Sequence, residues 1–140
     1  MASSQQSFLA KRLDSDALPL AVGDVLVLAA LITFGVTMHN GTGILASDPG
    51  YVAITVGVFL VGWLIFAPIV GAYSAGAAES AKAAIPLAIR SWVPADIVGV
   101  GLWTVIRGTD PIGIVIFALV TIVIGSLGLG VWRWLWFKLT

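Results

Sequence analysis

Four ionisable residues lie inside long apolar runs of this sequence: Asp24, Asp96, Arg90 and Arg133. A charged side chain within a membrane-crossing segment is costly, so each is a candidate site for binding a solute or a proton. Asp24 lies about six residues into its run, roughly 9 Å deep. If the helix of the third span begins late, Asp96 and Arg90 belong to the same cytoplasmic half of the membrane as Asp24 and Arg133, and the four are compatible with one charge cluster. The alternative is a structural ion pair, with the arginines extending toward the interface.

Two further polar residues, His39 and Arg107, lie toward the opposite ends of the runs that contain Asp24 and Asp96. On a helix, each base falls broadly on the same face as the acid of its own run. Acid and base are about 16–22 Å apart along the axis, so neither pair is in contact. The pattern fits a polar pathway through a bundle, and it also fits two unrelated helix-end charges.

Several classes of chemistry find no support in the sequence. Cysteine is absent and His39 is the single histidine, so no cysteine or histidine cluster can bind a metal. No phosphate-binding loop, nucleophile elbow or His-Glu-x-x-His motif is present. Seven basic residues balance seven acidic ones, which gives no reason to expect nucleic acid as a partner. We therefore predict no catalytic residue, metal or cofactor, and expect a protein that is not an enzyme.

The elements that position these residues are four apolar helices. Of the 140 residues, 59% are hydrophobic and 10% are charged, and the mean hydropathy is +1.06. A span needs roughly 20 apolar residues, and lipid offers no partner for free backbone groups. The sequence therefore predicts an all-α polytopic membrane protein, a four-transmembrane-helix bundle. A polar segment (1–17) precedes a transmembrane domain (18–140), whose spans are about 18–38, 51–73, 85–106 and 112–137.

Capping chemistry marks several boundaries. Asp48-Pro49 and Asp110-Pro111 each place an acid before a proline at the first helical position, which is typical of a helix start. Gly41–Gly43 and Gly108-Thr109 are expected to end the helices before them. The connection from Gly71 to Ala84 predicts a mobile loop or a short interfacial helix.

The third span allows two interpretations, because Arg90, Pro94 and Asp96 fall in its first half. Either Pro86 begins one long helix that Pro94 kinks, or residues 85–92 lie at the interface and a shorter helix begins near Pro94. Pro68 is a similar candidate for a kink in the second span.

The distribution of basic residues predicts the orientation. Six of the seven lie on one side: Lys11, Arg12, Lys82, Arg90, Arg133 and Lys138. Only Arg107 lies on the other. This asymmetry predicts a cell-membrane protein with both termini in the cytoplasm.

The two halves of the chain resemble each other weakly. An acid follows a proline in each half, at Asp24 and at Asp96, and each half then reaches an Asp-Pro pair. The pattern is compatible with a duplicated helix pair, which would give a parallel repeat.

The polar residues also carry a family resemblance, over about residues 22–137. The motifs are Asp24-Val25-Leu26 with His39, Gly62-Trp63, the segment from Leu102 to Arg107, and Trp132-Arg133. They resemble those of an uncharacterised family, domain of unknown function 3054, of small four-span membrane proteins from actinobacteria and halophilic archaea. This chain has Val36-Thr37-Met38 where relatives often carry arginines. The resemblance implies a membrane location and a fold, and no activity.

Two functions are compatible with these residues. The first is a module that binds or translocates a small solute or protons through Asp24, Asp96 and Arg133, acting as an oligomer. The second is an accessory or structural subunit of a larger membrane complex, because the chain is small and its loops are short. The expected partners are the lipid bilayer and either further copies of the chain or a larger complex.

Overall fold

Helices make up nearly all of the computed structural model, which describes residues 11–108 and 110–140. In chain order they are η1 (Ser15–Ala17), α2 (Leu18–Asn40), α3 (Ile44–Ser47), α4 (Pro49–Val70), α5 (Ala81–Arg107) and α6 (Pro111–Leu139). Four of these elements, with α2 taken together with η1, are long and apolar enough to cross a membrane. The fold class predicted from the sequence is confirmed: this is an all-α, multi-pass membrane protein.

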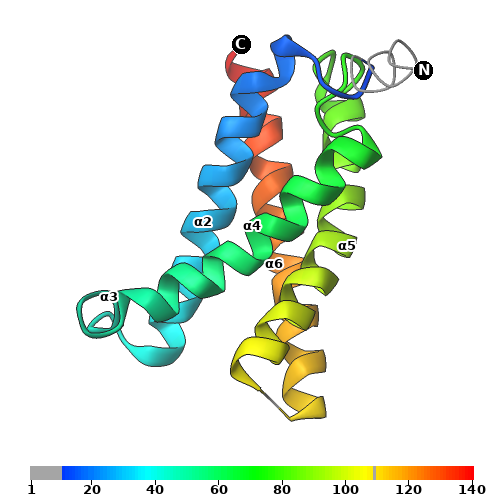
Figure 1. Ribbon diagram of the computed structural model, residues 1–140. Coiled ribbons are helices and arrows are strands. Elements are labelled where there is room, and N and C mark those ends of the chain that lie inside the picture. Colours follow the sequence, from blue (N-terminus) through cyan, green and yellow to red (C-terminus); the bar gives the residue numbers. More distant parts are fainter. Residues whose placement is uncertain (1–10, 109) are drawn as a thin grey trace.

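The four long helices form a ring around the bundle axis. α2 and α5 each pack against both α4 and α6, and α4 crosses the bundle at a steep angle (Figure 1). Both ends of the described chain lie at one end of the bundle, where α2 begins and α6 ends (Figure 1). We call this the terminal end. The opposite end, with α3 and the turn at Gly108, is the distal end.

The predicted helix starts are confirmed. Asp48 accepts a hydrogen bond from the Tyr51 backbone N–H at 3.1 Å and so caps α4. Asp110 does the same for α6, accepting from the Gly113 N–H at 3.2 Å. Each cap satisfies a backbone donor that the first helical turn leaves without a partner.

The predicted helix ends at glycine are found as well. α2 ends at Gly41 and α5 at Gly108, with φ angles of +83° and +72° that favour glycine. Thr109, which was expected to share the second of these turns, lies outside the described residues. α4 ends at Val70, because Gly71 adopts a left-handed conformation. Tyr73, placed at the end of the second span by hydropathy, therefore belongs to the connection that follows.

This connection, residues 71–80, packs closely at the terminal end. Ala72, Tyr73 and Ala77 are buried, and the Asp14 N–H donates to the Tyr73 carbonyl at 2.7 Å. Arg12 donates to the Val70 carbonyl at 3.2 Å. The connection is a series of turns, so the expectation of a short interfacial helix is wrong.

The third span is a single continuous helix. α5 begins at Ala81, where Ser80 caps it by accepting from the Ala83 N–H at 3.3 Å. Pro86 and Pro94 both lie within α5. Proline is tolerated inside transmembrane helices, where neighbouring groups satisfy the freed backbone. Of the two interpretations of this span, the structure supports one long helix over a shorter helix that begins near Pro94. The helix begins five residues before Pro86.

Two glycines permit close helix packing. A Cβ atom at Gly62 would lie 2.4 Å from the Ala95 carbonyl oxygen, so α4 and α5 touch backbone to backbone. A Cβ atom at Gly23 would overlap the Trp132 ring, which joins α2 to α6. Small residues commonly allow such close approach between membrane helices.

Candidate functional site

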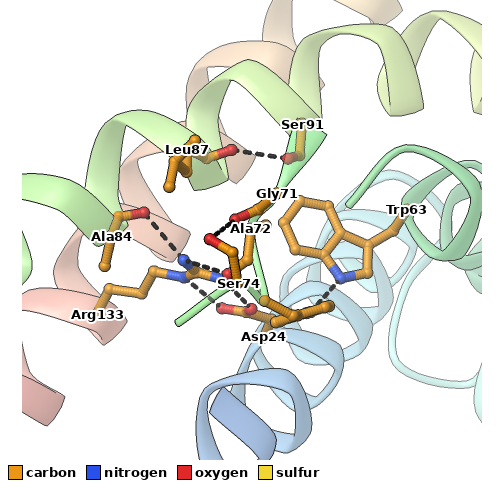
Figure 2. Close-up of polar contacts among 10 residues, drawn as sticks. Asp24, Trp63, Gly71, Ala72, Ser74, Ala84, Leu87, Ser91 and Arg133 are labelled. Atoms are coloured by element: carbon orange, nitrogen blue, oxygen red, sulfur yellow. Dashed lines mark hydrogen bonds and ion pairs between the residues drawn. The ribbon is translucent and has the colours of Figure 1, made fainter. Parts of the chain in front are cut away.

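Asp24 and Arg133 form a buried ion pair at the terminal end of the bundle. Arg133 Nη2 lies 2.6 Å from Asp24 Oδ2, and Nε lies 3.1 Å from Oδ1 (Figure 2). Both side chains are fully inaccessible to solvent. This two-point geometry is the strong form of an arginine–carboxylate contact. The structure thus brings together two of the four charges that the sequence placed in one cluster.

Backbone carbonyls complete the surroundings of Arg133. Its Nη1 donates to the Ala84 carbonyl at 2.9 Å, and both terminal nitrogens donate to the Ala72 carbonyl at 3.2 Å (Figure 2). We call Asp24, Arg133 and these two carbonyls the buried clamp. The clamp ties α2, α6, the start of α5 and the connection 71–80 into one unit. It therefore closes the terminal end of the bundle.

Tyr73 extends the clamp into the aromatic core. Its hydroxyl accepts a hydrogen bond from Trp63 Nε1 at 2.7 Å, and its ring lies 5.7 Å from the Arg133 guanidinium. Burial, together with the nearby Asp24 carboxylate, raises the pKa of the Tyr73 phenol above its ordinary value. Tyr73 therefore stays neutral. Trp63 is fully buried in the core beside Tyr73.

Asp96 and Arg90 stand apart from the clamp. Asp96 is fully buried, and neither carboxyl oxygen has a hydrogen-bond partner among the described residues. The Thr121 hydroxyl lies near it but donates to the Phe117 and Ala118 carbonyls. Arg90 is exposed on α5 and makes no ion pair within the described residues. The expectation of one four-residue cluster is therefore wrong, because Asp96 and Arg90 face different surroundings.

A cavity of about 310 Å³ occupies the distal half of the ring. All four long helices contribute to its walls, which are mainly aliphatic and aromatic. Its floor is formed by Leu28, Trp92 and Gly125, and the other lining residues are Leu31, Ile32, Gly35, Val36, His39, Asn40, Tyr51, Thr55, Trp103, Gly113, Phe117, Val120, Thr121 and Ile124. This volume lies at the lower limit of small-molecule sites, about 300–1,000 Å³, and the mixed lining is typical of them.

The polar groups of the cavity gather toward the distal end. His39, Asn40 and Tyr51 line the distal end of the cavity, and the Arg107 guanidinium stacks 4.7 Å from the centre of the Tyr51 ring. Deeper, Thr55 accepts a hydrogen bond from Trp103 Nε1 at 3.4 Å. His39 is thus part of the cavity wall, and Arg107 touches the wall through Tyr51.

Some residues of the cavity wall were candidates from the sequence, and others were not. His39 was a candidate from the sequence and lines the cavity, together with Leu28, Leu31 and Gly35 of the same helix. Trp92, Phe117 and Thr121 were missed. Thr55 and Thr121 carry hydroxyls within apolar runs, a signal that marks helix-packing or cavity positions in membranes.

The fold and the cavity together define a multi-pass helical membrane protein with a closed terminal end and a hollow distal half. A family model described as "Protein of unknown function (DUF3054)" matches residues 21–136. The chain belongs to this family, and the resemblance seen in the sequence is confirmed at that level. No curated protein and no solved structure matches the chain.

Proposed function

We propose that this protein is a membrane-embedded binding module for a small solute, and that the solute occupies the distal cavity. The observation that carries the proposal is the cavity itself, about 310 Å³ in volume and walled by all four helices of one chain. Well-packed interiors hold few voids larger than a water molecule. A space of this size is therefore more consistent with a site for a ligand than with a packing defect.

The buried clamp has a structural role in this proposal. Asp24 and Arg133 are fully inaccessible, and Arg133 already donates to Asp24, Ala72 and Ala84. Little bonding capacity remains for a solute. The hypothesis from the sequence was that the protein binds or translocates a small solute. The cavity supports binding, whereas translocation would also require the buried clamp to open.

Filling the cavity tests the proposal. A Cβ atom at Gly35 would meet nothing within 4 Å, and Gly35 lines the cavity. Gly35→Leu should therefore occupy the space without disturbing the helix. Gly57 is also free of neighbours within 4 Å but does not line the cavity, so Gly57→Leu is the matched control.

The readout is native mass spectrometry of protein purified in mild detergent. We expect a bound small molecule on the wild type and on Gly57→Leu, and its loss in Gly35→Leu. The proposal is wrong if the wild type carries no small molecule after exposure to membrane extracts, or if Gly35→Leu retains the same molecule.

The orientation is a second part of the proposal. We place both termini in the cytoplasm of a cell-membrane protein, because six of seven basic residues belong to the terminal half. The cavity then lies in the outer half of the membrane. Reporter fusions at Thr140 and within the turn between α2 and α4 should give cytoplasmic and external signals respectively, and the reverse result would invert the assignment.

An accessory subunit of a larger complex is the second candidate. It is supported by the closed clamp and by the exposed apolar side chains of α6, such as Val115, Leu119 and Leu127. Purification in mild detergent distinguishes the two, since a particle that contains only this chain counts against a subunit role. A homo-oligomer remains compatible with solute binding, because the cavity walls come from one chain.

A further inference from the structure

The cavity has a side opening toward the lipid, between α2 and α6. The two helices are in close contact near Gly128, where an added Cβ atom would approach the Leu31 side chain to 2.3 Å. One turn further along α2, Gly35 has nothing within 4 Å. On α6, Val120 and Ile124 line the cavity and are each 45% exposed. Side chains that belong both to the cavity wall and to the lipid-facing surface mark the side opening.

Polarity changes along the cavity. His39, Asn40 and Tyr51 lie at the distal end of the cavity, and Leu28, Trp92 and Gly125 lie at the floor. The His39 ring and the Tyr51 hydroxyl have no hydrogen-bond partner among the residues that the structure describes, so both are available to a ligand. His39 lies eleven positions after Leu28 on α2, which corresponds to about 16 Å along the helix. A ligand that fits has a hydrogen-bonding head at the distal end of the cavity and an apolar body that extends toward the floor.

The charges near the distal end of the cavity favour a ligand with an uncharged head. Asp48 and Asp110 are occupied as helix caps, and Arg107 stacks on Tyr51. The fixed charges at this end therefore offer no excess of cations for an anionic head. No carboxylate lines the cavity to bind a cationic one.

The volume limits the size of the ligand. A cavity of about 310 Å³ holds about ten groups of the size of a water molecule, at about 30 Å³ each. This is too small for a complete phospholipid chain with its head. From the side opening, the polarity gradient and the volume, we propose that the ligand is a short uncharged amphiphile. It carries a hydroxyl or carbonyl head, has about ten heavy atoms in its apolar body, and enters from the bilayer between α2 and α6. This inference rests on the proposed solute-binding function.

The source of affinity differs from that in a water-filled site. Lipid tails are as apolar as the cavity wall, so moving the apolar body from bilayer to cavity gains little. Discrimination should come instead from the head, where one hydrogen bond changes affinity by about tenfold. The length of the ligand's apolar body should affect binding only through an upper limit, which the floor at Leu28 and Trp92 sets.

Photolabelling in lipid nanodiscs tests the proposal. The probe is 1-decanol that carries a diazirine in its chain, and labelled residues are mapped by mass spectrometry. We expect labels on cavity-lining residues of α2 and α6 such as Leu31, Gly35 and Val120. Unlabelled 1-decanol should compete about tenfold better than decane, the loss expected for one hydrogen bond. Gly35→Leu should remove these labels, and Gly57→Leu should retain them.

Three outcomes overturn the inference. Labels spread evenly over lipid-facing residues such as Leu26 and Leu127 would indicate bulk lipid contact only. Equal competition by decane would exclude a recognised head. Stronger competition by decanoate or decyltrimethylammonium would exclude an uncharged one. In each case, a different small molecule found by native mass spectrometry and lost in Gly35→Leu would leave the proposed function intact.

Discussion

The buried clamp makes a quantitative prediction about stability. Arg133→Met removes the partner of Asp24 and leaves its carboxylate buried in a membrane protein without compensation. Breaking one side of a buried ion pair costs about 3–5 kcal/mol. The substitution also removes the donors to the Ala72 and Ala84 carbonyls, at about 1 kcal/mol each. We expect Arg133→Met to lower the free energy of unfolding by about 5–7 kcal/mol.

Removing both charges together should lower the free energy of unfolding by less than the sum of the two single substitutions. In the double variant Asp24→Leu/Arg133→Met neither position carries a charge that needs a partner, and only the two carbonyls lose their donors. Its loss of stability should be about 2 kcal/mol. The coupling between the two positions should therefore be about 3 kcal/mol or more, well beyond the roughly 0.5 kcal/mol within which independent sites add.

A double-mutant cycle measures this coupling. Each variant is unfolded reversibly in mixed micelles by titration with dodecyl sulfate, and helix content is followed by circular dichroism. Additive single effects, with a coupling below about 0.5 kcal/mol, would refute the argument that Asp24 and Arg133 act as one buried unit. The variant Arg90→Met is the control, because Arg90 is exposed and should change stability by less than about 0.5 kcal/mol.

Three further substitutions test other contacts by the same unfolding assay. Gly62→Ala should destabilise the protein by about 1–3 kcal/mol, because its Cβ would meet the Ala95 backbone at 2.4 Å. The control Gly57→Ala on the same helix should be neutral or stabilising. Equal effects of the two substitutions would refute the close contact at Gly62. Asp96→Val should stabilise by about 1–3 kcal/mol, since the buried carboxyl has no hydrogen-bond partner within the described chain; a loss of stability would show that Asp96 has a partner in the membrane. Tyr73→Phe should cost about 1–2 kcal/mol, because Trp63 Nε1 loses its acceptor; an unchanged midpoint would contradict that bond.

The sequence predicts the helices and their caps well, because those features are local. Asp48 and Asp110 cap the helices that follow them, and a capping acid before a proline needs no knowledge of the rest of the fold. The depth of Asp24 and Arg133 within their runs likewise indicates that the two lie at the same level of the membrane. Their pairing is consistent with this shared depth.

The cavity could not be predicted in the same way. The runs of α2, α4 and α6 are apolar on every side, because the lipid and the protein interior both favour apolar side chains. Hydrophobic periodicity therefore does not indicate which face of each helix turns toward the cavity. Arg90, which sequence reasoning placed in the charge cluster, lies exposed on α5. Pro94 was a false signal of a break, because it lies inside a continuous helix.

The most direct test of solute binding in the distal cavity uses introduced cysteines, since the native chain has none. Gly35→Cys places the single thiol in the cavity, and Gly57→Cys places it on the surface of α4 away from the cavity. The labelling rate of each variant by a membrane-permeant maleimide is measured in nanodiscs with and without the ligand found by mass spectrometry. The account predicts that ligand slows labelling at Gly35→Cys by about tenfold or more, as expected at high occupancy, and leaves Gly57→Cys unchanged. Equal rates with and without ligand at Gly35→Cys would contradict it.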